Sequence, residues 1–494
     1  MSGGGLIGPV SLSAGERAFY RGHISEAYGL FCRAACADPT SAVACRNAGA
    51  SAAVLRDLDA ACKHFTWLCR LEPGDHLPPL ELGKAQLLLG DHPASAAALS
   101  WSISLAPAVW TSMIYYSSAL RSIASPDAAS RFAERALTLA PFEPLALSEL
   151  GSVLREKRDF RGATDSLGRS VALEPNQPGT LLTMGFCFLH GDDYLSGWRF
   201  YEFRWRDSDF LRDNRDPPIQ RWSGQPEIKG LRLLVFSEQG FGDTIQFARF
   251  IPELERFEAD VTLLVPPELL PLLQGVRGVS RVVSRLGEDE TFHACCSLMS
   301  LTNIFQMDVD RVIGSRSPYL KAPRDLVRQW HTRLRPKNAP LIGVCWSGSQ
   351  NPRSTTRMIS LSEFSQIFEN DLTFVSLNRD VRASDRDALE KLRDRLRHFG
   401  DELTDFSVTA ALIENMDLVV TVDTSVAHLA ASVGKEVWII LPYNADWRWS
   451  EGRQDSIWYE RVRLFRQSRG DNWQEVLRRL RTALVSRARG ALAG

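Results

Sequence analysis

The eight residues GFGDTIQF, at positions 240–247, place two glycines and an aspartate between an apolar run and an amphipathic stretch. Gly240 and Gly242 allow the backbone to turn sharply and to approach a ligand closely. Asp243 can cap the helix that follows, and it can also act as a general base toward an acceptor hydroxyl at the edge of a cleft. The two roles are compatible. The stretch matches neither the G-x-G-x-x-G dinucleotide motif nor a P-loop.

A second stretch that can do chemistry is VTVDTSVAHLAASVGK, at 420–435. An apolar run ends at Asp423, and Thr424 and Ser425 then open a helix of small residues that contains His428. Backbone N–H groups and hydroxyls at the start of a helix can bind a phosphate group. The same residues also suit a capped helix that packs closely on a sheet, so both interpretations stay open.

Arginines follow two further apolar runs. The stretch CWSGSQNPRSTTR (345–357) supplies Arg353 and Arg357, and the segment 442–467 surrounds Arg448 with tryptophan and tyrosine. The planar guanidinium group binds phosphate oxygens in pairs. The aromatic segment suits either the packing of a core or the wall of a cleft.

A framework of strands and helices must position these stretches. After residue 230, short β-rich runs alternate with helical ones, which predicts parallel sheets with ligands at the carboxyl ends of the strands. The expected strands are 231–237, 261–265, 281–284, 341–347, 372–377, 417–422 and 436–441. A proline-rich stretch, 318–340, divides them into two groups. We therefore expect an α/β fold with two Rossmann-like lobes, 230–325 and 340–494, and a cleft between them.

The region before residue 207 repeats with a period of 34 residues. The prolines are Pro39, Pro73, Pro107, Pro141 and Pro175, and the glycines are Gly15, Gly49, Gly83, Gly151 and Gly185, with Ser117 in the one gap. This is the tetratricopeptide signature: two helices per repeat, a small residue where they cross, and proline after the second helix. We expect an all-α solenoid with a concave groove over 8–206. Proline and glycine indicate a linker over 207–229.

Composition limits the class of protein. A chain of 494 residues needs several domains. Its formal net charge of −1 shows no basic footprint for nucleic acid. The sequence shows no signal peptide and no run long enough to span a membrane, so a cytoplasmic protein with nine reduced cysteines is expected. Cys32 and Cys36 lack the second pair that a zinc site needs.

The second half resembles the heptosyltransferase-like glycosyltransferases of the GT-B fold, in the form fused behind tetratricopeptide repeats. The matching stretches are GFGDTIQFARF, SLN (376–378), VDTSVAHLA, PYNADWRW, DSIWY and RLFRQ. The resemblance covers residues 195–480. It implies a nucleotide-sugar donor held mainly by the C-terminal lobe and an acceptor that approaches the N-terminal lobe.

The resemblance also implies roles for single residues. Asp243 is the expected catalytic base. The expected donor-binding residues are Gly240, Gly242, Arg357, Asn378, Asp423, Thr424, Ser425, His428 and Arg448. The sequence departs from the family at Arg357 and at Asn378. The stretch that begins at Arg357 is RMISL, where the family usually has Arg-Ser-Ile-Pro-Leu, and the stretch that ends at Asn378 is SLN, where the family usually has Ser-Leu-Gln. No metal or other cofactor is expected, since helix N-termini and arginines stabilise the leaving phosphate in this fold. We interpret the lone Asp308-Val309-Asp310 as surface loop.

Two groups of enzymes share the architecture of repeats followed by a GT-B domain. One comprises the cytoplasmic flagellin glycosyltransferases, which use a CMP-linked nonulosonic acid. The other comprises the O-GlcNAc transferases, whose groove carries one asparagine per repeat. The matching position here reads Ser13, Asn47, Glu81, Tyr115, Glu149 and Thr183, which is no asparagine ladder. The favoured hypothesis is a protein O-glycosyltransferase that acts on flagellin. The alternatives are a glycan or lipopolysaccharide heptosyltransferase-like enzyme, an O-GlcNAc-transferase-like enzyme and a non-catalytic repeat scaffold.

Overall fold

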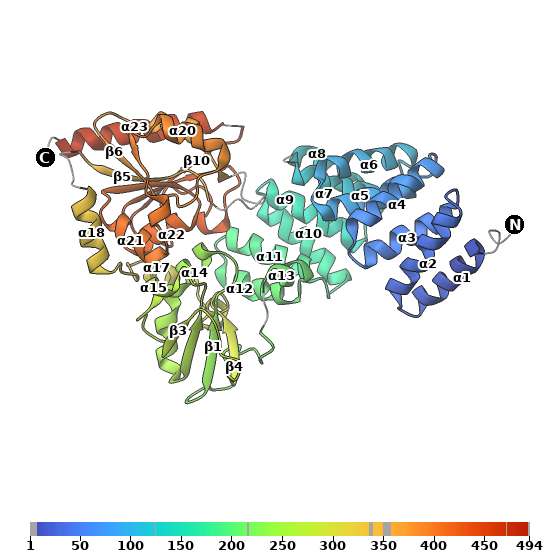
Figure 1. Ribbon diagram of the computed structural model, residues 1–494, viewed down its shortest axis with the longest axis horizontal. Helices are drawn as coiled ribbons and strands as arrows, with labels where there is room; N and C mark the ends of the chain where they lie inside the picture. Colours follow the sequence, from blue (N-terminus) through green and yellow to red (C-terminus); the bar gives the residue numbers. More distant parts are fainter. Residues whose placement is uncertain are drawn as a thin grey trace. The chain divides into compact units, whose positions relative to one another are not determined.

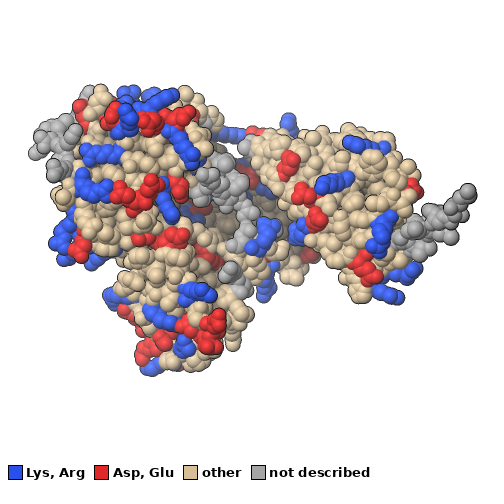
Figure 2. Space-filling view, in the orientation of Figure 1, with Lys and Arg blue, Asp and Glu red and all other residues tan. Residues whose placement is uncertain are grey.

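The computed structural model describes residues 7–123, 125–214, 217–334, 339–348, 357–470 and 472–492. The chain forms two compact units, Met1–Cys187 and Phe188–Gly494. The first is built from helices and the second from sheets and helices (Figure 1). On the visible face of each unit, acidic and basic side chains are interspersed (Figure 2). Within the described residues, no helix is both long and apolar enough to cross a membrane.

The first unit is a series of helices, and from the first to the tenth each packs on the next along the chain. The helices are α1 (Ile7–Tyr20), α2 (Ile24–Ala37), α3 (Ala42–Val54), α4 (Leu58–Leu71), α5 (Leu77–Leu89), α6 (His92–Leu105), α7 (Trp110–Ser122), α8 (Pro126–Leu139), α9 (Pro144–Glu156), α10 (Phe160–Leu173) and α11 (Pro178–His190), the last of which runs into the second unit. The helical pairs have the expected 34-residue spacing. The predicted all-α solenoid is confirmed.

The periodic glycines mark the points where the two helices of a repeat touch. A Cβ atom at Gly83 would lie 2.5 Å from Leu99 Cγ, and one at Gly49 would lie 2.8 Å from a ring carbon of Phe65. Ser117, which stands in the one gap of the glycine series, has a hydrogen-bond partner in the next repeat. Ser117 donates through its hydroxyl to the buried carboxylate of Glu149, at 2.8 Å. A serine at this position therefore supplies a hydrogen bond that the buried acidic group of the next repeat needs.

The second unit begins with a short helical segment before the first strand. Its elements are α12 (Tyr194–Tyr201), the 3-10 helix η1 (Glu202–Arg206) and α13 (Ser208–Asp213). Residues 188–206, which the sequence analysis places in the solenoid, belong to this unit. Trp198 donates to the carbonyl of Met307 at 2.8 Å, and its ring lies 5.3 Å from that of Trp447. The segment is thus packed into the α/β part of the chain.

The first sheet has four parallel strands in the order β3-β2-β1-β4. The strands are β1 (Arg232–Phe236), β2 (Asp260–Leu264), β3 (Arg281–Val283) and β4 (Ala294–Ser297). The helices around them are α14 (Phe241–Phe247), η2 (Ala248–Phe257), α15 (Leu270–Leu273), α16 (Leu301–Ile304) and α17 (Val309–Gly314). In register, Leu234 of β1 lies beside Thr262 of β2 and Cys295 of β4.

The second sheet has six parallel strands in the order β10-β9-β8-β5-β6-β7. The strands are β5 (Leu341–Cys345), β6 (Thr373–Ser376), β7 (Leu396–Arg397), β8 (Leu418–Val422), β9 (Val437–Leu441) and β10 (Val462–Arg466). Every residue of β5, β8 and β9 is buried, as expected where helices cover both faces of a parallel sheet. The order is that of the doubly wound dinucleotide fold. The predicted α/β class and two Rossmann-like lobes are confirmed.

Helices cover and connect the second sheet. They are α18 (Arg324–Leu334), α19 (Leu361–Phe364), η4 (Ser365–Ile367), η5 (Ala383–Asp385), α20 (Arg386–Lys391), η6 (Gly400–Glu402), α21 (Phe406–Glu414), α22 (Ser425–Ser432), η7 (Trp447–Trp449) and α23 (Trp473–Leu492). The buried residues Leu477 and Leu480 of α23 pack into the same apolar core as Ile342 of β5.

The structure differs from the sequence-based expectation in several elements. All seven expected strands form, but β4, β7 and β10 were not expected. The last residues of the aromatic segment 442–467 form β10 at the edge of the second sheet. Asp308 caps α17 by accepting from the N–H of Arg311, so the Asp308-Val309-Asp310 stretch begins a helix and is not a loop. In the expected linker, Trp222 is buried and its backbone N–H donates to the carbonyl of Cys295 of β4 at 2.7 Å.

Candidate active site

The loops that carry the predicted site residues follow strands at the two points where the strand order reverses. In the first sheet, the chain runs from β1 to β2 and β3 on one side and then crosses to β4 on the other side of β1. The loop after β1 leads to Asp243. In the second sheet, β5 and β8 are neighbours, and the loops after them carry Gly348 and Thr424. Ligands bind at such switch points in open α/β sheets.

Asp243 lies in the first turn of α14. Gly240 caps the helix with an extended backbone, and Asp243 is the third helical residue, so the expectation of Asp243 as the cap is wrong. The helix starts three residues earlier than expected, and the carboxylate reaches back to its cap: Asp243 Oδ2 accepts from the Gly240 N–H at 3.0 Å. Its other oxygen, Oδ1, accepts from Arg448 Nη2 at 2.6 Å. The side chain remains 21% exposed.

Gly242 stands where two helices approach each other. A Cβ atom at this position would lie 3.0 Å from His428 Cδ2 and 3.4 Å from the Cα of Ser425. The glycine therefore allows the first turn of α14 to touch the first turn of α22. This contact brings the candidate base of the first lobe beside the candidate phosphate site of the second.

Arg448 is held by side chains of both lobes. Its Nε donates to Gln246 Oε1 at 2.7 Å, its Nη1 to Asp446 at 2.8 Å, and its Nη2 to Asp243. Burial lowers the pKa of Arg448, but the carboxylates of Asp446 and Asp243 outweigh burial and raise it. The guanidinium group is thus a fixed cation that orients the Asp243 carboxylate. Its three nitrogen atoms donate hydrogen bonds to protein side chains and are not directed toward a nucleotide-sugar.

A second ion pair lies at the end of β8. Arg357 Nη1 donates to Asp423 Oδ2 at 3.0 Å, and the Asp423 side chain is 5% exposed. Burial raises the pKa of Asp423, although the charge of Arg357 opposes this shift. Arg357 is 37% exposed and can reach a ligand from this position. Arg353, the other predicted arginine of this stretch, lies outside the described residues.

His428 is a buried member of α22. Its Nδ1 lies 2.9 Å from the Tyr459 hydroxyl, and its ring stacks on Trp449 at a centroid distance of 5.4 Å. Burial, together with the positive charges of Arg448 and Arg249, lowers the pKa of His428 to about 3. The imidazole is therefore neutral at physiological pH and adds no positive charge to a phosphate site.

A cavity of about 750 Å³ opens at the carboxyl ends of the second sheet. Its lining includes Ser347 and Gly348 after β5, residues 377–382 after β6, and residues 424–426 at the start of α22. Phe241 and Glu268 of the first lobe close its other side. The volume suits a ligand of nucleotide size. Thr424 and Ser425 are thus brought to the cavity, and the N-terminus of α22 faces it.

Asn378 also lines the cavity, but its side chain serves the protein. Its Nδ2 donates to the carbonyl of Ser347 at 2.9 Å and to the Ser347 hydroxyl at 3.0 Å. Its Oδ1 accepts from the Trp346 N–H at 3.3 Å. Asn378 thereby fixes the loop after β5, which forms part of the cavity wall.

Several cavity residues were not singled out from the sequence. They include Arg379, Arg382 and Arg386 after β6, and Phe241, which lies two positions before Asp243. Arg382 is anchored, because its guanidinium donates to the buried Asp385 and to the Ile359 carbonyl. Their position directly after a predicted strand end was the one signal that could have found them.

Comparisons with known proteins agree with this geometry. Residues 383–440 match the family model "Glycosyltransferase family 9 (heptosyltransferase)". The match runs through β8 and α22, so it includes Asp423, Thr424 and His428. The chain is 24% identical over 410 residues to Protein FlbA of Caulobacter vibrioides, an alignment that covers 76% of this chain and 64% of the relative. The chain thus spans less than two thirds of that relative's length.

Solved structures similar to the chain include helical repeat proteins. The TPR protein YrrB, described as having an unusual peptide-binding site, is 16% identical, with a TM-score of 0.31, over 35% of this chain and 88% of its own. The thermophilic TPR protein TTC0263 of Thermus thermophilus is 16% identical, with a TM-score of 0.32, over 37% and 98%. Cut9–Hcn1 of the APC/C is 22% identical, with a TM-score of 0.36, over 41% and 42%. The 34-residue helical repeats and the match of residues 383–440 to the glycosyltransferase family model together indicate tetratricopeptide repeats joined to a heptosyltransferase-like glycosyltransferase domain.

Proposed function

We propose that this glycosyltransferase moves a sugar from a nucleotide-sugar donor to a Ser or Thr hydroxyl of a protein that the repeats recruit. The observation that carries the proposal is the meeting of two helix starts, where Gly242 allows the turn with Asp243 to touch the turn with Ser425. A base and a phosphate site within one small region are what transfer from a phosphate leaving group needs.

Each residue then has a step in the reaction. The acceptor oxygen forms a bond to the anomeric carbon, the bond from that carbon to the donor phosphate breaks, and the electron pair leaves with the phosphate. Asp243 takes the hydroxyl proton, and Arg448 keeps its carboxylate oriented. The N–H groups at the start of α22, with Thr424 and Ser425, bind the donor phosphate. Arg357 adds a positive charge. The helix N-terminus and this arginine stabilise the negative charge that develops on the leaving phosphate, so the step needs no metal ion.

The repeats support a protein acceptor, because an extended solenoid offers a binding surface that a small sugar acceptor does not require. The resemblance to flagellin glycosyltransferases favours flagellin as that acceptor and a CMP-linked nonulosonic acid as the donor. Of the six positions that correspond to the asparagine ladder of O-GlcNAc transferases, one carries asparagine here, Asn47, and Glu149 is buried in the repeats. A folded or helical partner therefore fits better than an extended peptide held by its backbone.

The test is a transfer assay with the purified chain. Unmodified flagellin is incubated in parallel with CMP-linked nonulosonic acid, UDP-GlcNAc and ADP-heptose, and the intact mass of the flagellin is measured. A mass increase with the CMP donor supports the full proposal, and one with another donor corrects the sugar but keeps the protein acceptor. Transfer to a lipopolysaccharide core and to no protein would instead support the heptosyltransferase-like alternative.

A binding experiment separates the donor from the acceptor. Thermal unfolding is followed with CMP, UDP and ADP, since a ligand at about 100 times its Kd adds about 2.7 kcal/mol to stability. A response to one nucleotide alone identifies the donor class even if the acceptor is wrong. If no nucleotide shifts the unfolding transition at millimolar concentration, the result favours a non-catalytic repeat scaffold.

A further inference from the structure

The loop between β1 and α14 is held in a strained conformation just before Asp243. Gln239 has φ of +61°, in the left-handed region that non-glycine residues rarely adopt. Such strain persists only where the surroundings hold the backbone in place, and it is found often at functional sites. The question is which residues hold it.

Most of the holding contacts come from the helical segment that precedes the first strand, and two come from the end of β4: the Ser297 hydroxyl donates to Glu238 Oε1 at 2.9 Å, and the Gln239 amide lies 3.5 Å from Met299 Sδ. Asn214 Oδ1 accepts from the backbone N–H of Gln239 at 2.9 Å. The hydroxyl of Tyr201 accepts from the Gln239 side-chain amide. Arg204 donates to both oxygens of Glu238, the residue before, at 2.8 and 3.3 Å. Three of the residues that fix these two consecutive loop positions therefore lie outside the sheet.

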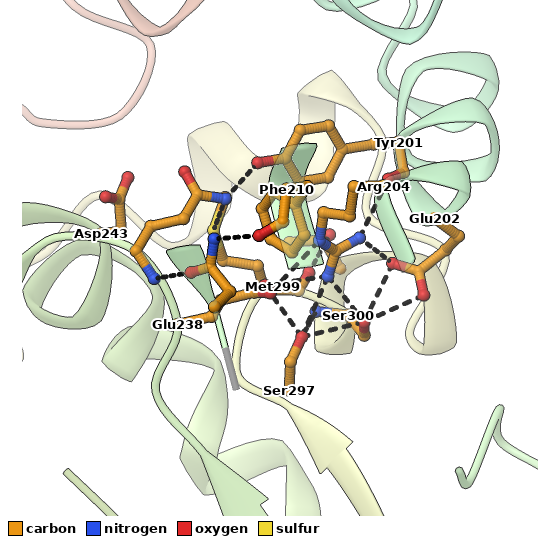
Figure 3. A network of polar contacts seen from close by, with 12 residues as sticks. Tyr201, Glu202, Arg204, Phe210, Glu238, Asp243, Ser297, Met299 and Ser300 are labelled. Carbon is orange, nitrogen blue, oxygen red and sulfur yellow. Dashed lines mark hydrogen bonds and ion pairs between the residues drawn. The ribbon is translucent and has the colours of Figure 1, made fainter. Parts of the chain in front are cut away.

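Arg204 is the centre of this network (Figure 3). Its side chain is fully buried, and it also donates to the hydroxyls of Ser297 at 3.0 Å and Ser300 at 2.9 Å. Its guanidinium group lies 4.5 Å from the centre of the Tyr201 ring. Burial lowers the pKa of Arg204, but Glu202 and Glu238 outweigh it and raise the pKa, so the cation persists. Such a site fixes geometry, because each buried donor has a partner.

The loop passes this geometry on to Asp243. Gly240 follows Gln239 directly, and its N–H donates to Asp243 Oδ2. A change in the backbone of Gln239 therefore moves the donor that holds the carboxylate. Figure 3 shows Asp243 at the edge of the same group of side chains.

We propose that Tyr201 and Arg204 are positioning residues for the Asp243 base, and that the catalytic part of the chain begins with the segment that carries them. This inference rests on the proposed role of Asp243. The segment before β1 is then a working part of the active site, whereas the sequence alone indicates the end of the solenoid and a linker.

Two mild variants of the full chain test the proposal. Tyr201→Phe removes only the hydroxyl that holds Gln239. Gln239→Gly removes the side chain that contacts Tyr201 and relieves the positive-φ strain, and this relief offsets part of the entropy that glycine adds to the unfolded chain. The matched control is Tyr194→Phe, because the Tyr194 hydroxyl is also buried in α12 but accepts from Trp458 at 3.2 Å and does not touch the loop.

The first measurement is amide hydrogen exchange in the native protein, which needs no substrate. We expect the amides of residues 239–244 to exchange about tenfold faster in Tyr201→Phe and Gln239→Gly than in the wild type, with no such change in Tyr194→Phe. Unchanged exchange in both loop variants would overturn the proposal. This readout is independent of which donor and acceptor are correct.

The second measurement is sugar transfer from the CMP-linked nonulosonic acid to flagellin. We expect kcat to fall about tenfold to hundredfold in the two loop variants, with CMP affinity unchanged, since small displacements of a catalytic group cost this much. Normal kcat in variants with a loosened loop would overturn the positioning role. If the wild type itself transfers no sugar, the proposed function fails while the exchange result still decides whether the segment holds the loop.

Discussion

Two strand ends in this molecule look alike in sequence but differ in how they are held. After β1 and after β8, an aspartate lies close to the start of a helix, and each aspartate pairs with an arginine. Asp243 lies inside its helix and keeps 21% of its side chain exposed, whereas Asp423 lies before its helix and keeps 5%. The first loop contains Gln239 with its positive φ and takes most of its holding contacts from the helical segment before β1. The difference supports the proposal that Asp243, the more exposed carboxylate, takes the proton and that the buried Asp423 has a supporting role.

The largest expected effect is the loss of the base. Asp243→Asn keeps one oxygen, which can accept from Gly240 or from Arg448 but not from both, and it cannot take a proton. We expect kcat for transfer to fall by about 10²- to 10⁴-fold, the usual contribution of a general base. Nucleotide-induced stabilisation should stay unchanged. The comparison fails if transfer persists near the wild-type rate, and a purely capping role follows if the variant instead loses its folded structure.

The contact between the two helix starts gives the next effect. In Gly242→Ala the new methyl group meets His428 at 3.0 Å, and that ring is fixed by Trp449 and Tyr459. We expect a loss of about 1–3 kcal/mol in the free energy of unfolding, as for other overpacked sites.

Gly240→Ala is the matched control for this variant, because a Cβ atom there meets only Asp243 Oδ2, at 3.3 Å. Urea denaturation of both variants measures the difference. Equal losses for the two would show that the helix starts do not depend on this close approach.

The neutral histidine between the loops predicts a pH dependence. Burial lowers the pKa of His428 to about 3, whereas a histidine in an unfolded chain titrates near about 6.5. The unfolded state therefore binds the extra proton between these values, and stability is full above the higher value and lost as the pH falls below it.

We expect His428 to contribute a slope of up to about 1.4 kcal/mol per pH unit in that window. Denaturation at a series of pH values should give a shallower slope for His428→Gln than for the wild type. The control is His23→Gln, which removes a histidine whose side chain is 65% exposed. An identical slope in all three proteins would show that His428 gains its proton in the folded state as easily as in the unfolded one.

The sequence predicted what depends on local pattern. The 34-residue period gave the helical pairs, the apolar runs gave seven of the ten strands, and GFGD and VDTS marked both strand-end turns. Two of the three missed strands lacked such a pattern, since β7 has two residues and β4 reads ACCS. The third, β10, reads VRLFR and lies in the segment 442–467, which was interpreted as an aromatic core or cleft wall.

Contacts between distant positions could not be predicted in this way. Arg448 lies 205 residues from Asp243, and Tyr201 lies 38 residues from Gln239. Neither pair leaves a periodic trace in the sequence, so the partners of the candidate base emerged only from the fold. The break at Ser117 was visible in the repeat, but its partner Glu149 was not.

The smallest expected effect concerns the second aspartate and decides the comparison. Burial raises the pKa of Asp423 above its ordinary value. A carboxyl group whose folded pKa is raised costs stability once the pH rises through that pKa, so the neutral amide of Asp423→Asn avoids the cost. The amide oxygen still accepts from Arg357, which is itself partly open to solvent. We therefore expect the free energy of unfolding at neutral pH to stay within about 1 kcal/mol of the wild type or to rise.

The rate of transfer should fall less than about tenfold in Asp423→Asn, because no proton moves to Asp423. Parallel denaturation and transfer assays on Asp423→Asn and Asp243→Asn measure both quantities. If Asp423→Asn proves the more damaging to transfer, the roles of the two strand ends are reversed.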